Sequence, residues 1–160
     1  MKIFFTYFKK SIHSQYDAAN EAIELIKSKK ATCVTVNNNQ IINAASPKGI
    51  SYLLDLYDKG ALEGVFIADT IIGKAAAMVL TLGGAKGCYG YTVSKSAAEW
   101  LKLHNIPLKY ATVVPFIVNR KGNGMCPMEE AVKEINDPYE AIETLKNKVA
   151  ELKKSTKMNK

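Results

Sequence analysis

The stretch GVFIADTIIGKAAAMVLTLGGAKGCYGYTV, residues 64–93, predicts a buried strand, a buried helix and a second buried strand. Residues 65–68 form a short apolar run without alternation, which is typical of a strand covered on both faces. Residues 71–82 are apolar almost all round, and a helix without a polar face lies inside a protein or a membrane. Crossing a bilayer takes about 20 apolar residues, and this segment is shorter, so we expect a helix in the protein core. Gly83 and Gly84 should end it, because glycine adopts the left-handed cap conformation at no steric cost.

Helical and strand patterns alternate on both sides of this unit. Apolar residues at helical spacing, β-branched runs and turn or cap residues mark the boundaries. The expected elements are a helix over residues 16–29, a hairpin of strands over 32–36 and 41–44, a helix from Ser46 to Gly60, the unit of residues 64–93, a helix from Ser94 to Asn105, a strand over 108–114, a helix from Pro127 to Ile135 and a last helix from Asp137 to Leu152.

This order of elements predicts a three-layer α/β/α sandwich with a five-stranded mixed sheet and extra C-terminal helices. The two hairpin strands pair antiparallel, whereas strands joined through helices of about ten or more residues have to be parallel. No internal repeat or linker divides the chain, so we expect one domain. Its parts are an N-terminal extension (1–15), a core (16–114), a loop with C-terminal helices (115–152) and a tail (153–160).

The charge of the chain permits an acidic partner. The net charge is +7 and the isoelectric point is about 9.2, which suits a nucleotide, a nucleic acid or an anionic surface. Six of the lysines lie in the last 15 residues, where a solvated tail is the favoured interpretation. We therefore expect nucleic-acid binding to be unlikely.

The cysteines and the first residues indicate a cytoplasmic protein. Cys33, Cys88 and Cys126 are odd in number and widely spaced, which argues against a disulfide framework and for a reducing compartment. The start, MKIFFTYFKK, has an apolar stretch too short for a signal peptide, and no small-residue cleavage site follows it. We expect no membrane association.

Three segments carry a resemblance to known proteins. The order of helices and strands, together with AAAMVLTLGGAKGCYGYTV (residues 75–93), resembles the cytidine-deaminase-like fold. More closely, about residues 17–143 resemble a small uncharacterised prokaryotic family that shares this fold but not its zinc. That resemblance rests on ADTIIGKAAA (68–77), LGG (82–84) and RKGNGMCPME (120–129).

The zinc ligands of the deaminases are missing from this sequence. Deaminase chemistry uses the motifs H-x-E and P-C-x-x-C, whose ligands hold a zinc-bound water beside a catalytic glutamate. The chain has neither motif, and its histidines are His13 and His104. Where the first ligand would open a helix, the chain has Ser46-Pro47-Lys48, and Asp69 to Lys74 stand in place of the cysteine pair. We expect no metal and no cofactor, and the fold alone implies no activity.

Asp69 and Lys74 are the first candidates for a ligand site. We expect them to flank the N-terminus of the central helix, where open α/β sheets bind ligands and free N–H groups favour anions. A lysine in a first helical turn opposes the helix dipole, so Lys74 needs a partner. That partner is a ligand phosphate or carboxylate, or Asp69 in a buried ion pair that only fixes the loop.

The loop before residue 127 supplies a second group of candidates. Cys126 precedes a helix start, a position that lowers the pKa of a thiol, and Arg120 and Lys121 would lower it further. Cys126 and Asp69 are thus weak catalytic candidates, although a cysteine used as a small apolar cap is favoured. Asn119, Arg120 and Lys121 suit phosphate binding. Glu129 is a further ligand-binding candidate, with the closing of a helix cap as the alternative.

Other polar and aromatic residues could complete the same cleft. Ser46 and Lys48 occupy the place of the first deaminase ligand, although a plain N-cap serine and a surface lysine explain them equally well. Three aromatic side chains could stack on a base, although core packing is their favoured role: Tyr89, Tyr91 and Trp100.

These observations leave three hypotheses of function. The first is a zinc-free deaminase-fold protein that binds a nucleotide-like or other anionic small molecule beside Asp69 and the 119–126 loop. The second is a thiol-dependent transferase or hydrolase that uses Cys126. The third is a nucleic-acid or protein interaction module that uses the basic C-terminal helix. The exposed hairpin edge and the apolar start make a homodimer plausible.

Overall fold

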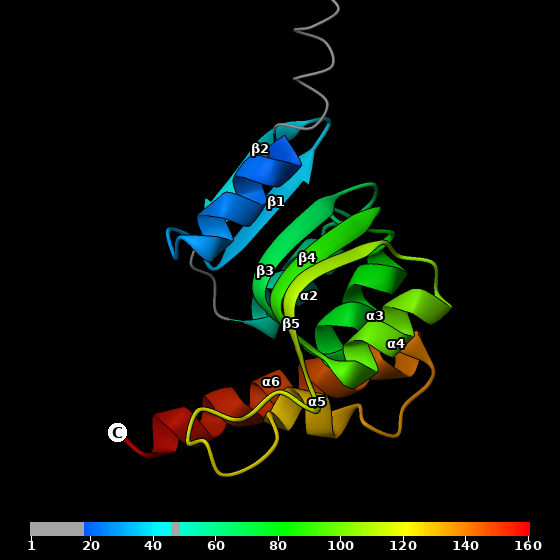
Figure 1. Cartoon of the computed structure of the whole chain (residues 1–160). Helices are drawn as coiled ribbons and strands as arrows, with labels where there is room; N and C mark the ends of the chain where they lie inside the picture. Colours follow the sequence, from blue (N-terminus) through cyan, green and yellow to red (C-terminus); the bar gives the residue numbers. More distant parts are fainter. Residues whose placement is uncertain (1–17, 46–48) are drawn as a thin grey trace, which may run out of the picture.

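The computed structural model describes residues 18–45 and 49–160, which form one five-stranded sheet with helices on both faces (Figure 1). The N-terminal extension over residues 1–15 and the candidate site residues Ser46 and Lys48 lie outside the described residues. Within the described part of the chain, no helix combines the length and apolar character needed to cross a bilayer.

The sheet confirms the predicted mixture of antiparallel and parallel pairing. Its order is β2-β1-β3-β4-β5; β1 runs antiparallel to both β2 and β3, while β3, β4 and β5 are parallel. Asn38 and Asn39 take positive φ values of 47° and 58° between β1 and β2, as the asparagine turn predicted. The strands are β1 (Cys33–Asn37), β2 (Gln40–Ala45), β3 (Phe66–Ile72), β4 (Gly87–Ser94) and β5 (Leu108–Val114).

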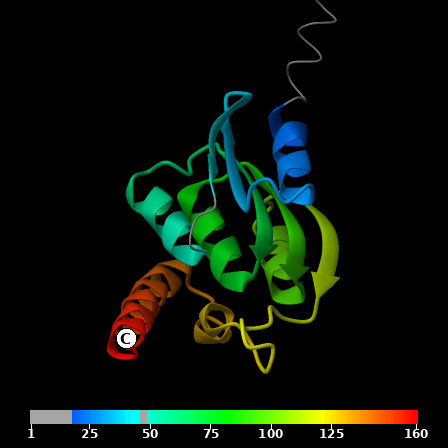
Figure 2. The same cartoon turned by 90° about the vertical axis from the view of Figure 1, so that its left-hand side faces the viewer.

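Helices cover the two faces of the sheet unequally (Figure 2). The helix over residues 18–27 lies on one face and packs its apolar side against β1, β3 and β4. On the other face α3 lies between α2 and α4, and α6 packs on its outer side. The bounds are α2 (Ile50–Asp58), α3 (Lys74–Gly83), α4 (Lys95–Leu103), α5 (Pro127–Ala131) and α6 (Pro138–Met158).

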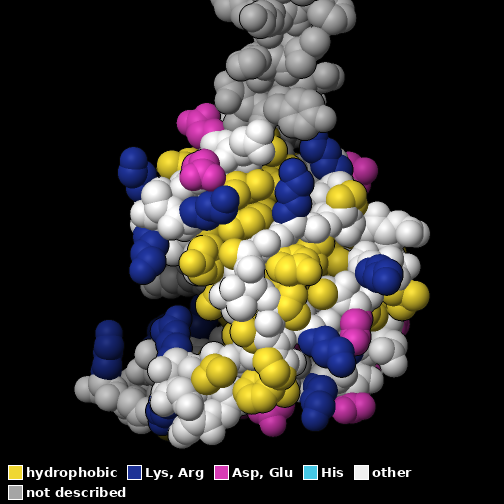
Figure 3. Space-filling view, viewed as in Figure 1, with side chains coloured by type: hydrophobic (Ala, Val, Ile, Leu, Met, Phe, Trp, Pro, Cys, Tyr) yellow, Lys and Arg dark blue, Asp and Glu magenta, His cyan; other side chains and the backbone are white. Residues whose placement is uncertain are grey.

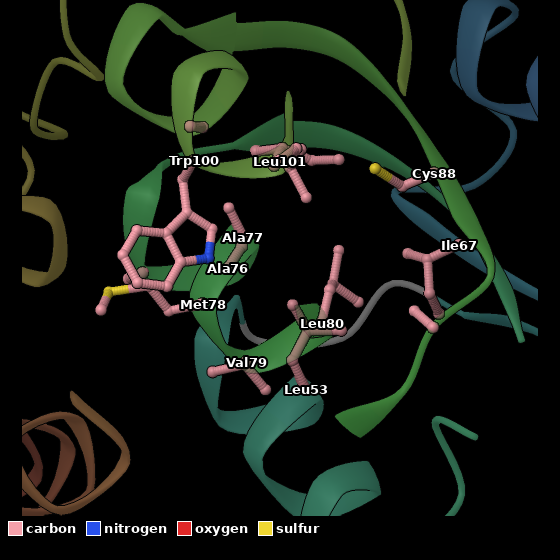
Figure 4. Close-up of a cluster of buried hydrophobic side chains, with 14 of the residues drawn as sticks. Leu53, Ile67, Ala76, Ala77, Met78, Val79, Leu80, Cys88, Trp100 and Leu101 are labelled. Atoms are coloured by element: carbon pink, nitrogen blue, oxygen red, sulfur yellow. The ribbon is translucent and has the colours of Figure 1, made fainter. Parts of the chain in front are cut away.

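Helix α3 is the centre of the larger core, as its sequence predicted. All residues from Lys74 to Leu80 are buried, and Gly84 ends the helix in the left-handed conformation with φ of 81°. Leu53 of α2, Ile67 of β3 and Leu101 of α4 point toward it (Figure 4). The same cluster includes side chains of α6, namely Ala141, Ile142 and Leu145.

Strand β3 is longer than the sequence pattern indicated, and this changes the position of Asp69. The predicted helix start at residue 71 is wrong, because Ile71 and Ile72 pair with β4 and the helix begins only at Lys74. Thr70 and the two isoleucines are β-branched and prefer a strand. Asp69 therefore lies inside the strand, opposite Cys33 of β1, rather than at the junction of strand and helix.

Three other helix bounds differ from the prediction. Helix α2 begins at Ile50, and α5 ends at Ala131 instead of continuing to Ile135. Helix α6 continues to Met158, past residue 153, where a tail was expected. Two of the predicted caps are present: the Ser94 hydroxyl accepts from Ala97 N–H, and the Asp137 carboxylate accepts from Tyr139 N–H. The N-cap of α2 is Gly49 rather than the predicted Ser46.

Candidate functional site

Glu129 occupies the N-terminus of α3, where the sequence predicted an anionic ligand. Its Oε1 atom accepts hydrogen bonds from Lys74 N–H at 3.2 Å and from the Ser96 hydroxyl at 3.1 Å, and its Oε2 atom accepts from Ile117 N–H at 2.6 Å. Gly73 makes room for it, since a Cβ at that position would lie 3.3 Å from Oε1. Glu129 does form a cap, but for α3 rather than for its own short helix α5.

Lys74 is buried and hydrogen-bonded to the backbone beyond α5. Its Nζ atom donates to the carbonyl oxygens of Lys133 at 2.8 Å and Ile135 at 2.7 Å, and lies 5.9 Å from the centre of the Trp100 ring. Burial lowers the pKa of the Lys74 ammonium, while the charge of Glu134 opposes that shift. Within the described residues no ion pair joins Lys74 to Asp69, so the charge of Lys74 ties the α5 segment to α3.

Asp69 is a carboxyl group held between two buried thiols. Burial raises the pKa of Asp69 from its ordinary 3.8 to about 7, against the hydrogen bonds from Ile71 N–H, the Cys33 thiol and Thr70 N–H, which lower it. Burial and the Asp69 charge raise the pKa of Cys88 to about 12, and also raise that of Cys33. Both thiols stay protonated near neutral pH and are therefore poor nucleophiles.

The loop before α5 closes on itself instead of lining a cleft. Asn119 exchanges side-chain and backbone hydrogen bonds with Asn123 and accepts from Gly122 N–H, and Val118 pairs with Met125. Its two cationic residues, Arg120 and Lys121, are exposed.

Cys126 lies at the N-cap of α5, as predicted, but its thiol makes no cap hydrogen bond there. His104 stacks against Trp100 at the C-terminal end of α4, with ring centres 4.2 Å apart, and His13 lies outside the described residues. Among the described residues, no hydrogen bond joins the Cys126 thiol to a side chain that could act as its base.

The predicted site residues thus do not form one cleft. Lys74 and Glu129 come together at the start of α3, whereas Asp69 lies within the sheet and Arg120 and Lys121 face solvent. Among the described residues, no three His, Cys, Asp or Glu side chains are grouped so that they could hold a metal ion.

The basic C-terminal helix is only partly available for a charged partner. Lys146 lies 2.6 Å from a carboxylate oxygen of Asp58 in α2, and Lys148 lies 3.4 Å from Glu151 within α6. Such exposed ion pairs contribute about 0–1 kcal/mol.

A hollow that the sequence analysis did not identify lies on the other face of the sheet. It is open to solvent and has a volume of about 620 Å³ between the helix over residues 18–27 and strands β4 and β5. A volume of this size is within the range of small-molecule sites. Its lining residues are Asn20, Ile23, Glu24, Lys27, Tyr89, Lys109, Tyr110 and Ala111.

Tyr89 distinguishes this hollow from an ordinary surface depression. The side chain is only 3% exposed, and its hydroxyl is buried without a hydrogen-bond partner among the described residues. Burial raises the pKa of Tyr89, against the opposing charge of Lys27, so the hydroxyl is a donor near neutral pH. The sequence analysis assigned Tyr89 to core packing, because nothing in the pattern of its strand indicates that the ring borders a surface hollow.

Comparison with known proteins relates the chain to one family. The DUF1893 family, a domain of unknown function, matches residues 21–149. A DUF1893 family protein of Thermotoga maritima, TM1506, has a crystal structure that is similar with a TM-score of 0.75 and 25% identity, over 83% of this chain and 90% of that chain. No curated protein matches the sequence.

Proposed function

The chain belongs to the DUF1893 family, and we propose that it binds a nucleotide-like or other anionic small molecule and does so without zinc. The fold that accompanies this proposal is the cytidine-deaminase-like one. Its support is the order of elements, in which an antiparallel hairpin precedes three parallel strands joined through α3 and α4. The setting is cytoplasmic, since all three cysteines are free thiols.

We propose that the ligand binds in the hollow beside Tyr89 rather than at the start of α3. The Glu129 carboxylate already accepts from the first N–H group of α3, so a second anion would meet a like charge there. Two carbonyl oxygens already hold the Lys74 ammonium. The N-terminus of α3 and the Lys74 ammonium, which the sequence analysis assigned to a ligand, therefore bind groups of the protein itself.

The buried Tyr89 hydroxyl is the observation that carries the proposal. Buried polar groups in proteins nearly always have a partner, and one without a partner calls for a water, an ion or a ligand. Tyr89 lines the hollow, so a ligand oxygen that displaces the side chains covering the hydroxyl would accept the missing hydrogen bond.

The charges at the hollow favour an anion. Lys27 and Lys109 both line it, against a single carboxylate, Glu24. Lys27 Nζ lies 3.3 Å from Glu24 Oε1, but both side chains are about half exposed or more, so exchanging this pair for a ligand phosphate costs little. Lys109 has no ion-pair partner within the described residues.

Tyr110 borders the hollow but does not offer its ring to a ligand there. It pairs with Gly90 of β4, whereas Lys109 pairs with Tyr89, so alternation along β5 points the Tyr110 side chain to the opposite face of the sheet. An anionic group at Lys27 and Lys109 and a hydrogen-bond acceptor at the Tyr89 hydroxyl fit a nucleoside monophosphate or a compound of similar size.

The proposal predicts that nucleoside monophosphates raise the melting temperature of the protein, whereas the matching nucleosides and inorganic phosphate do so less. Lys109→Ala should weaken monophosphate binding about tenfold, because it removes a charge-assisted hydrogen bond. Tyr89→Phe should weaken binding about fivefold and leave the free protein as stable as before, because the lost hydroxyl had no partner. Calorimetric titration measures both effects.

Lys102→Ala provides the matched control, since Lys102 is exposed on α4 and does not line the hollow. It should bind monophosphates like the wild type. If no monophosphate stabilises the wild-type protein, or if Tyr89→Phe and Lys109→Ala bind as tightly as Lys102→Ala, the hollow is not the binding site.

A further inference from the structure

Strand β5 leaves one side of its backbone unpaired. It is the last strand in the order β2-β1-β3-β4-β5, so only β4 pairs with it in the described structure. Every residue from Lys109 to Val113 is exposed. An edge with this much free backbone is a template for pairing with another strand.

The side chains on and after β5 are unusually apolar for a surface. Tyr110, Val113, Phe116 and Val118 are 40–55% exposed. Lys109 is the single charged residue between Leu108 and Val118. Figure 3 shows hydrophobic side chains gathered over the strands on this side of the molecule. Contiguous exposed apolar surface of this kind marks an interaction site.

The opposite edge of the sheet is less suited to pairing. The register between β1 and β2 shifts between Thr35 and Val36, and such an irregularity disturbs an edge. The Asn43 side chain of β2 is also hydrogen-bonded to the Tyr52 hydroxyl of α2. The sequence analysis pointed to this hairpin edge for a homodimer, whereas the exposed residues favour β5.

We propose that two copies of this chain pair through their β5 strands, antiparallel and about a two-fold axis at Ala111. The exposed run from Lys109 to Val113 is centred on that residue, so both copies present the same surface to each other, as a two-fold interface requires. The two five-stranded sheets would then become one continuous sheet.

The charges within β5 fit this register. With Ala111 at the axis, Lys109 of one copy lies opposite Val113 of the other. The two lysines are then about 13 Å apart along the strands, at about 3.3 Å per residue. This separation exceeds the screening length of about 8 Å at physiological salt, so their repulsion is small.

This inference does not rest on the proposed ligand, because the β5 edge is exposed whether or not the hollow is filled. The two nevertheless share residues, since Lys109, Tyr110 and Ala111 also line the hollow. An axis perpendicular to the sheet would place both hollows on the same face, side by side.

Analytical ultracentrifugation of the full chain tests the proposal with two substitutions at one position. Val113→Lys places a positive charge opposite Lys109 of the second copy, and Val113→Glu places a negative one there. Like charges directly opposite weaken strand pairing and opposite charges strengthen it. We expect the wild type and Val113→Glu to dimerise, and Val113→Lys to have a dissociation constant at least tenfold higher than that of Val113→Glu.

Comparing the two substitutions separates an effect on dimerisation from an effect on the folding of the monomer. Residue 113 is 41% exposed, and both substitutions replace the same apolar side chain by a charged one. Circular dichroism at low concentration should therefore show two equally folded monomers. A wild-type chain that remains monomeric at about 100 µM overturns the proposal, since the edge is then open to solvent or covered from within the chain. A dimer that responds equally to both substitutions overturns it too.

Discussion

Replacing Glu129 by alanine should lower the free energy of unfolding by about 4 kcal/mol. The side chain is 3% exposed, and its two oxygens accept from Lys74 N–H, Ile117 N–H and the Ser96 hydroxyl. Each buried donor left without a partner costs about 1–3 kcal/mol. A loss of this size is a large share of the total stability of a domain, which is about 5–15 kcal/mol.

Two further variants make the Glu129 result interpretable. Glu129→Gln keeps the shape and one acceptor oxygen but turns the other oxygen into a donor, so we expect a loss of about 2 kcal/mol. Glu130→Ala alters the neighbouring, exposed carboxylate and should change stability by less than about 0.5 kcal/mol. Urea unfolding followed by circular dichroism measures all three variants. Equal losses for Glu129→Ala and Glu130→Ala would show that the carboxylate does not hold α3, α4 and the loop together.

Replacing Asp69 by asparagine should stabilise the protein in alkaline solution and have little effect in acid. The folded state raises the pKa of Asp69 from 3.8 to about 7, so the folded protein holds a proton that the unfolded chain releases. The stability from this group is fully present below pH 4 and is lost as the pH rises through 7. Asparagine imitates the protonated form and avoids that loss.

The size of the Asp69 effect follows from the same pKa difference. A change from 3.8 to about 7 corresponds to roughly 4 kcal/mol, at about 1.4 kcal/mol per tenfold change in proton affinity. Because the residue is not fully buried, we expect about 2 kcal/mol at pH 8.5 and about 0.8 kcal/mol at pH 5, where the unfolded chain has already released the proton but the folded protein has not. Urea unfolding at both pH values measures the difference between variant and wild type.

Asp55→Asn is the control for the pH series, since Asp55 lies exposed on α2. Its effect on stability should be the same at both pH values. A gain for Asp69→Asn that is equal at pH 5 and 8.5, or a loss at pH 8.5, would mean that the carboxyl is ionised in the folded protein across this range.

Local signals in the sequence were sufficient wherever a structural feature depends on neighbouring residues. Ser94 and Asp137 cap the helices they precede, Gly84 ends α3, and β5 spans the predicted residues 108–114. In each case the hydrogen bond or the preferred backbone angle joins residues only a few positions apart.

The candidate site could not be predicted in the same way, because its contacts join distant residues. Glu129 caps a helix whose first residue lies 55 positions earlier, and Lys74 bonds carbonyls 59 and 61 positions later. A lone charge at the start of an apolar helix indicates that a partner exists, but the pattern does not identify it. The hollow was missed for the same reason, since Tyr89 comes to lie beside the helix over residues 18–27 only when the sheet forms.

The apolar surface of α3 also has a consequence for synthesis on the ribosome. Its outer side is covered by Ile142 and Leu145, which are translated some 60 residues after the helix itself. When the sheet, α2 and α4 have already left the ribosome, the nascent chain therefore still exposes the outer side of α3 until α6 leaves the exit tunnel. We expect such a chain to recruit chaperones during translation, and a message truncated before α6 to yield an aggregating product rather than a smaller folded domain.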